Sequence, residues 1–422
     1  MNFCAVRLSL IVLTTLGLAW GSVNAADYNY PYRDPYLATI TTAVMNAEGH
    51  TPGAKRQAIH VPVLPDRNQL PTLEGRGDLS VALYRQSRPA PLIFILSGIG
   101  SSPYFGAATY FAGLFHEKGF HVLVLPSPMS WNFALAASRS GAPGYVPQDA
   151  RDLYAAMQKT LEVLKTQHGL RITRVDFMGV SLGALEGAYL SVLDAKEGKI
   201  GIGRYLLANP PVDLPYAVKK LDDMDALGEK FGRAKAGAIM LKALAIAEPF
   251  TEERRERRDF GKLVKGFSVF STEELQFLIA EYLQTVLPEL VYVTDVIQEQ
   301  RAPATKKQAR KRIRDAKSVT FMDYSEKNGL PVWRVETGEP QADLDSFTRR
   351  GSLAPILEEL RGNPRVYVIH NADDFLVERK SLDELKEAMG DRMVVYPYGG
   401  HLGNLWYSET RDHILGLFGT PP

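Results

Sequence analysis

The fold is decided by residues 175–188, which read Val-Asp-Phe-Met-Gly-Val-Ser-Leu-Gly-Ala-Leu-Glu-Gly-Ala. The centre of this stretch, residues 179–183, matches the pattern Gly-x-Ser-x-Gly. A serine in this pattern lies at a sharp strand-to-helix turn, where glycines two positions before and after it avoid a collision. An apolar β-type run precedes the turn and a row of small residues follows it, so we predict that Ser181 is an exposed nucleophile. A glycine-rich turn with an incidental serine is the alternative.

Strands and helices alternate on both sides of this turn. Residues 92–96 and 121–125 are continuous apolar runs, as in strands buried on both faces. Residues 59–64 and 79–84 alternate apolar and polar side chains, as an antiparallel edge pair does. Further strands are predicted at 172–178, 205–208, 366–369 and 393–396, and helices at 104–118, 149–168, 184–193, 353–361 and 408–418. Such alternation predicts an α/β fold, with a mostly parallel sheet covered on both faces.

A mainly helical, highly charged segment interrupts this alternation between residues 215 and 345. An insertion of about 130 residues has the size of a small domain. Its charge runs at 252–258 and 306–314 are typical of solvated helical faces, and contact with anionic lipid or cell wall is the alternative. We therefore predict a signal peptide (1–25), an irregular N-terminal arm rich in Tyr and Pro (26–57), a core in two parts (58–214 and 346–422) and a helical cap (215–345) between them.

The first 25 residues have the pattern of an export signal. Arg7 ends a basic start, and residues 8–20 form an apolar run that is short for a membrane span. Small side chains follow, so we predict cleavage after Ala25, with an uncleaved anchor as the alternative. The only cysteine, Cys4, lies in this segment, so the mature chain has no disulfide and no thiol nucleophile. An exported protein without disulfides fits a bacterial periplasm or the medium.

Composition excludes some partners. The chain has 422 residues, of which 45% are hydrophobic and 23% charged, as in ordinary globular proteins. Its 49 Lys and Arg residues nearly balance 48 Asp and Glu residues, for a formal net charge of +1. No general attraction to nucleic acid or to an anionic membrane is therefore expected.

A serine hydroxyl needs a base to accept its proton, and histidine has a suitable pKa. Of eight histidines, only His401 lies in the loop directly after the last predicted strand, whereas His413 lies in the closing helix. Gly399 and Gly400 precede it and let the loop turn back over the carboxyl edge of the sheet, where Ser181 is expected. His370, at the end of the preceding strand, is the alternative, although we expect it below the site.

The acid that orients this imidazole is expected in the loop after residues 366–369. Asp373 and Asp374 are adjacent there, so both cannot point at one histidine. We predict Asp374, with Asp373 as the alternative acid and Asp213 as a third candidate. The chain order is then serine, aspartate, histidine.

Acyl transfer creates an oxyanion that needs two backbone N–H donors. One is expected from Leu182, the residue after the nucleophile. The other is expected from the glycine-rich loop at 97–102, where we predict Ile99 first and Gly100 second. As a phosphate-binding loop this segment lacks the lysine of a Walker motif and the glycine spacing of a dinucleotide site.

Four segments together resemble the α/β-hydrolase superfamily, namely residues 97–100, 179–183, 371–374 and 399–403. The resemblance covers about residues 58–215 and 350–420, and it implies an eight-stranded, mostly parallel sheet with a cap inserted after the sixth strand. The chain departs from the family at two positions. Ser97 stands where a histidine is usual, and Asn371 stands where the acid loop usually has glycine.

The expected activity is hydrolysis of a carboxylic ester through an acyl-serine intermediate, as in esterases and lipases, without a metal or organic cofactor. The expected substrate is a small-molecule or lipid-like ester. Because a fold does not choose its reaction, a peptidase, an amidase, an acyltransferase and a non-catalytic binding module are alternatives. Nucleic acid is not an expected partner, and peripheral membrane contact stays open. The expected location is the periplasm or the medium.

Overall fold

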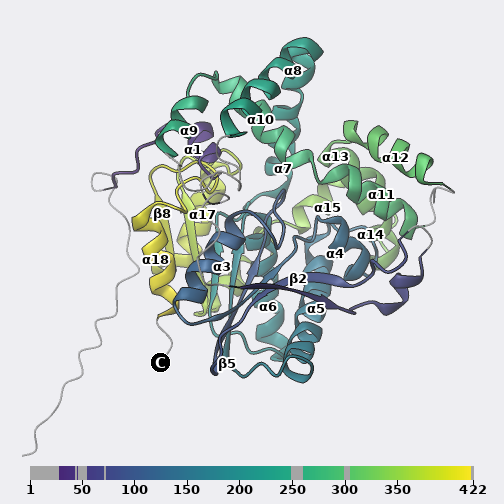
Figure 1. Cartoon of the computed structure of the whole chain (residues 1–422), viewed down its shortest axis with the longest axis vertical. Helices are drawn as coiled ribbons and strands as arrows, with labels where there is room; N and C mark the ends of the chain where they lie inside the picture. Colours follow the sequence, from purple (N-terminus) through teal and green to yellow (C-terminus); the bar gives the residue numbers. More distant parts are fainter. Residues whose placement is uncertain are drawn as a thin grey trace, which may run out of the picture.

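The computed structural model describes residues 28–42, 45, 55–70, 73–248, 260–298 and 305–419. The expected signal peptide and the charge run at 252–258 lie outside these residues. The described elements form a central sheet with helices on both faces and a helical insertion at one end (Figure 1). No helix among the described residues is long and apolar enough to cross a bilayer.

The sheet has eight strands in the order β1-β2-β4-β3-β5-β6-β7-β8. β2 pairs antiparallel with β1 and with β4, and all other pairs are parallel. The strands are β1 Arg56–Val61, β2 Leu79–Tyr84, β3 Ala90–Leu96, β4 His121–Leu125, β5 Ile172–Val180, β6 Tyr205–Ala208, β7 Val366–Asn371 and β8 Met393–Tyr396. This arrangement confirms the predicted fold class.

Two hydrophobic cores lie against the two faces of the sheet. One face packs against α3 (Ala107–Glu117) and α18 (Ser408–Phe418), around Phe111 and Phe418. The other packs against helices that include α4 (Trp131–Ala136), α5 (Val146–Thr166), α6 (Leu182–Glu197), α16 (Leu357–Gly362) and α17 (Arg379–Met389). β3 and β4 are buried along their whole length because both faces are covered.

Several predicted boundaries need correction. The helix predicted at 104–118 begins only at Ala107, because Gly106 has a φ of 97° that no helical residue adopts. The helix predicted at 184–193 begins at Leu182, directly after Ser181. The N-terminal arm is not irregular throughout: Asp34 Oδ1 accepts hydrogen bonds from two amides of a short helix, α1 (Pro35–Ile40).

The insertion between β6 and β7 is helical, as predicted. Its helices are α7 Leu214–Asp225, α8 Leu227–Ala247, α9 Phe260–Phe267, α10 Thr272–Gln284, α11 Leu287–Ile297, α12 Lys306–Asp315, α13 Phe321–Tyr324, α14 Leu330–Thr337 and α15 Leu344–Arg350. The predicted end at residue 345 falls inside α15. In Figure 1, α8, α9 and α10 gather around α1, and α11 to α15 form a second group. α1 packs against α9 and α10.

The free energy of unfolding should depend on Asp194, a buried carboxylate of α6. Its oxygens accept hydrogen bonds from the hydroxyls of Tyr154 and Tyr205 and from the amides of Gly201 and Ile202. Asp194→Asn replaces one of the two oxygens by an NH₂ group. This group cannot accept the two hydrogen bonds that the oxygen accepts. We expect a loss of about 1.5–3 kcal/mol in urea denaturation at neutral pH, the range for a hydrogen bond to a charged group.

The pH dependence of this loss has a defined sign. Burial alone raises the pKa of Asp194, but its hydrogen bonds outweigh burial and lower it. The carboxylate therefore stabilises the fold above its unfolded pKa of about 3.9, and this contribution disappears as pH falls through the native pKa. The difference between variant and wild type should shrink below about pH 4. Asp383→Asn, which removes an exposed partner of Arg379, is the control and should cost under about 1 kcal/mol.

Candidate active site

Ser181 lies at the turn between β5 and α6, with φ of 55° and ψ of −122°. A side chain on Gly179 would collide with the backbone of Gly183, and a Cβ on Gly183 would lie 2.5 Å from the carbonyl oxygen of Leu96. Both positions therefore have to be glycine. The first amides of α6 have no acceptor within the helix, so they and the positive end of the helix dipole face this turn.

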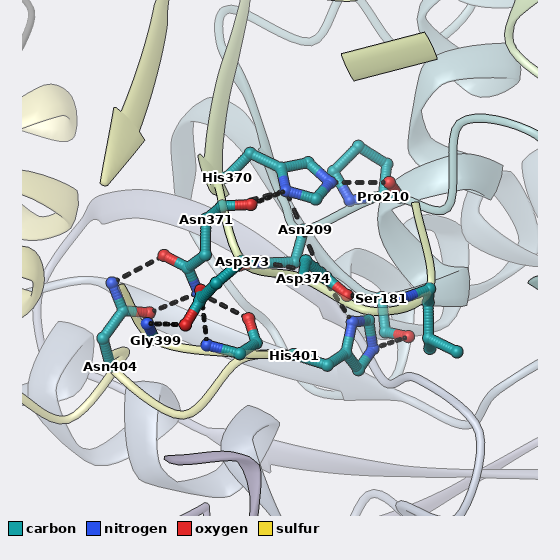
Figure 2. Close-up of polar contacts among 12 residues, drawn as sticks. Ser181, Asn209, Pro210, His370, Asn371, Asp373, Asp374, Gly399, His401 and Asn404 are labelled. Atoms are coloured by element: carbon teal, nitrogen blue, oxygen red, sulfur yellow. Dashed lines mark hydrogen bonds and ion pairs between the residues drawn. The ribbon is translucent and has the colours of Figure 1, made fainter. Parts of the chain in front are cut away.

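Ser181, His401 and Asp374 form one hydrogen-bonded chain (Figure 2). Ser181 Oγ lies 2.8 Å from His401 Nε2, and His401 Nδ1 lies 2.9 Å from Asp374 Oδ2. With the proton on Nδ1, the imidazole donates to the carboxylate and accepts from the serine. The histidine and the aspartate are buried. The structure thus brings together the three residues predicted from the sequence.

Asp374 has further hydrogen-bond donors that keep it fixed. Its Oδ2 also accepts from Asn209 Nδ2 at 3.0 Å, and its Oδ1 accepts from the amide of Leu376 at 3.0 Å. Burial raises the pKa of Asp374, but the charge and the hydrogen bond of His401 outweigh burial and lower it. The carboxylate is therefore ionised at neutral pH.

Sequence analysis missed Asn209. This residue follows β6 directly and has a φ of 49°. Its side chain reaches the acid loop because the carboxyl ends of β6 and β7 are adjacent in the parallel sheet. The sequence did offer one signal for Asn209, namely a polar side chain at the end of a strand next to β5.

Asp373, the alternative acid, lies beside the histidine but does not contact its ring. Its carboxylate accepts from the amides of Gly399 at 3.2 Å and Gly400 at 2.9 Å. Asp373 therefore holds the segment that carries His401 (residues 397–404, the histidine loop). Burial raises the pKa of Asp373 to about 6.

The other two alternatives are occupied elsewhere. His370 is fully buried, its Nε2 lies 3.1 Å from the carbonyl oxygen of Pro210, and burial lowers its pKa. Asp213 caps α7 by accepting a hydrogen bond from the amide of Tyr216. Neither is hydrogen-bonded to Ser181 or to the ring of His401.

Asn371, which stands where related proteins usually have glycine, also supports the histidine loop. The side-chain amides of Asn371 and Asn404 exchange two hydrogen bonds of 2.8 Å. Asn371 Nδ2 also donates to the carbonyl oxygen of Gly400 at 2.8 Å. Figure 2 shows this network on the side of the histidine loop away from Ser181. The departure from the family pattern thus supplies an additional anchor.

The loop at 97–102 runs directly over the serine. A Cβ on Gly98 would lie 2.9 Å from Ser181 Cβ, so the loop approaches the serine too closely for a side chain at position 98. Ile99 lines the same cavity as Ser181, whereas the carbonyl oxygen of Gly100 accepts a hydrogen bond from Tyr282 on α10. Leu182 and Ile99, with Gly100 as the alternative, stay predictions as the oxyanion donors.

A cavity of about 280 Å³ opens at Ser181 and His401. Its walls come from α1, the loop at 97–107, α8, α9, α10 and the acid loop. The apolar part of the lining includes Ile40, Met45, Ile99, Met240, Ala243, Leu244, Ala247, Phe267, Leu278, Ile279, Leu283, Phe375 and Leu376. Among the described lining residues there is no Lys, Arg, Asp or Glu.

In the described part of the chain, no three His, Cys, Asp or Glu side chains are grouped so that they could hold a metal ion.

Asp373 should impose a pH dependence on stability. Since its native pKa of about 6 exceeds its unfolded pKa, the folded protein retains a proton that the unfolded chain loses, so this group destabilises the fold as pH rises from about 4 to about 6. Asp373→Asn removes that titration. In urea denaturation across this range, the stability of the wild type should fall relative to the variant. A difference that is constant with pH would contradict the assignment.

Comparisons with known proteins give structural similarity at low identity. No protein-family model and no curated protein matches the chain. A thermophilic carboxylesterase cloned from a metagenomic library is 14% identical, with a TM-score of 0.44 over 92% of this chain and 97% of its own. A proline iminopeptidase of Mycobacterium smegmatis is 16% identical, with a TM-score of 0.42 over 86% and 97%. A hydrolase of Pseudomonas aeruginosa is 16% identical, with a TM-score of 0.39 over 87% and 100%.

The fold can be assigned from the topology of the chain itself. At the β1 edge, β2 pairs antiparallel with both of its neighbours, β1 and β4, and the strands from β4 to β8 are parallel. The serine turn joins β5 to α6, and the helical insertion follows β6. This combination is the α/β-hydrolase fold, as the resemblance of the four sequence segments implied.

Proposed function

We propose that this chain is a serine hydrolase that acts on carboxylic esters through an acyl-serine intermediate. The observation that carries the proposal is the hydrogen-bonded chain Ser181–His401–Asp374 at the base of an apolar cavity. A nucleophile, a base and a buried acid in this order form the group that acyl transfer requires.

The reaction proceeds in two halves. Ser181 Oγ attacks the carbonyl carbon while its proton moves to His401 Nε2, and the amides of Leu182 and Ile99 bind the oxyanion. The bond to the alcohol oxygen then breaks, and His401 protonates the departing alcohol. Water, deprotonated by His401, attacks the acyl-serine, and release of the acid returns the proton to Ser181. Asp374 holds the imidazole and stabilises its charged form.

The lining of the cavity favours a neutral, apolar substrate. Without a charged side chain among its described lining residues, the cavity offers no partner to the amino or carboxylate terminus of a peptide. Its volume of about 280 Å³ lies just below the usual range of about 300–1,000 Å³ for ligand pockets. We therefore propose that the cavity binds the apolar acyl or alcohol group of a small ester.

We also propose that the protein is exported to the periplasm or the medium. The support is the basic start, the apolar run at 8–20 and the small residues before Ala25. A mature chain without cysteine is insensitive to the redox state of either compartment.

Three variants test the catalytic assignment. Ser181→Ala should abolish labelling by a fluorophosphonate probe and lower kcat on p-nitrophenyl esters by about 10⁴-fold or more. Asp374→Asn should lower kcat by about 10³- to 10⁴-fold, because the amide carries no charge and can turn its NH₂ group to the ring, which places the proton on Nε2 instead of Nδ1. Asp373→Asn leaves the hydrogen bond between His401 and Asp374 in place and should retain most of the activity. Labelling that survives Ser181→Ala would falsify the assignment, and cleavage of peptide amides or acyl transfer in preference to ester hydrolysis would replace the proposed reaction.

The acyl-binding role of the cavity can be tested on α8. Ala247 lines the cavity, whereas Ala245 on the same helix is exposed. Ala247→Phe should lower kcat/KM for longer acyl esters by about tenfold relative to acetyl esters, because the ring occupies part of the pocket. Ala245→Phe, the matched control, should leave the ratio unchanged. An equal loss on all chain lengths in Ala247→Phe would contradict this role.

A further inference from the structure

The histidine loop cannot hold its shape by regular structure. Gly399, Gly400 and Leu402 all have positive φ, of 150°, 55° and 70°. At a positive φ, Leu402 has a higher conformational energy than glycine would have. A loop of this kind persists only where neighbouring segments fix it, and one of its neighbours is the N-terminal arm.

The short helix α1 lies directly on this loop. A Cβ on Gly400 would collide with the carbonyl oxygen of Pro35, and a Cβ on Gly403 would collide with that of Ala38. The carbonyl oxygen of Gly403 also accepts from the hydroxyl of Tyr30 at 3.0 Å. The backbones are therefore in contact over one turn of α1, and the glycines of the loop make room for it.

One side chain of α1 bonds to the backbone of His401 itself. Thr39 Oγ1 donates its proton to the carbonyl oxygen of Pro35 at 2.7 Å, which leaves its lone pairs free to accept. The amide of His401 donates to this oxygen at 2.9 Å. His401 is 6% exposed, so without Thr39 its amide would be a buried donor that lacks this acceptor.

The arm also contacts the acid loop and the substrate cavity. The ring of Tyr36 stacks on that of Phe375, the residue after Asp374, with centroids 4.6 Å apart. Thr39 and Ile40 line the cavity together with Ser181. The same short segment therefore touches the histidine loop, the acid loop and the space assigned to the substrate.

We propose that Thr39 is a positioning residue, which holds the backbone of His401 so that Nε2 stays within hydrogen-bonding reach of Ser181. The arm is then a part of the active site, although it precedes the first strand of the sheet. This role in turnover rests on the proposed hydrolase function, whereas the contact between Thr39 and His401 can be measured without it.

The test compares Thr39→Val with Thr39→Ser. Valine keeps the shape of threonine but has no acceptor, and serine keeps the acceptor. Thr166→Val is the matched control, because Thr166 Oγ1 also donates to the carbonyl oxygen four positions before it (Glu162, 2.8 Å), whereas Thr166 lies on α5 and does not line the cavity. On esters that the wild type hydrolyses, Thr39→Val should lower kcat by about tenfold to a hundredfold, the equivalent of one unsatisfied buried donor. KM should change by less than about twofold.

Thr39→Ser and Thr166→Val should both keep kcat near the wild-type value. The proposal is overturned if Thr39→Val keeps wild-type kcat, if Thr39→Ser is as impaired as Thr39→Val, or if the loss appears in KM rather than in kcat.

Hydrogen–deuterium exchange of the peptide that contains His401 separates this inference from the proposed function. Exchange should be faster in Thr39→Val and unchanged in Thr39→Ser and Thr166→Val, whether or not the protein hydrolyses esters. A wild-type protein that no fluorophosphonate labels would overturn the hydrolase function, and the exchange rates would still decide the contact. Equal exchange in all four proteins would overturn the positioning role.

Discussion

The turn at Ser181 exists only because backbone atoms occupy the space that side chains at Gly179 and Gly183 would fill. Gly183 packs against the carbonyl oxygen of Leu96, the last residue of β3. Through that contact, the loop after β3 lies over Ser181, next to the start of α6. Two glycines thus set the distances among the nucleophile, the candidate oxyanion donors and the cavity.

The position of the His401 imidazole depends on more than the two hydrogen bonds that its ring makes. Its ring bonds to Ser181 and Asp374, whereas the backbone of its loop is held by several other side chains, Thr39 among them. Asp373 binds the amides of Gly399 and Gly400, and Asn371 binds a carbonyl of the same loop. The histidine loop is therefore rigid through support from outside, as accurate proton transfer requires.

Local patterns predicted the sheet and the three central residues, because each leaves a local signal. β3 and β4 are buried on both faces and read as unbroken apolar runs, and His401 follows two glycines after the last strand. Thr39 leaves no such signal, since it acts on a residue 362 positions away. Asn209 acts on a residue 165 positions away, and its only local signal is its place at the end of a strand next to β5. α1 was missed because a six-residue helix depends on its Asp34 cap, within a stretch whose Tyr and Pro content suggests irregular chain.

The separation of 362 positions between Thr39 and His401 also has a consequence for when the protein becomes active. Closing so long a loop costs chain entropy, which contacts already formed elsewhere have to offset. The sheet around β3 and β5 can form before the two ends of the chain meet, and the serine turn with it. A nascent or partly folded chain would then present Ser181 before His401 is fixed beside it, so the proposed catalytic group would be completed as one of the last events of folding.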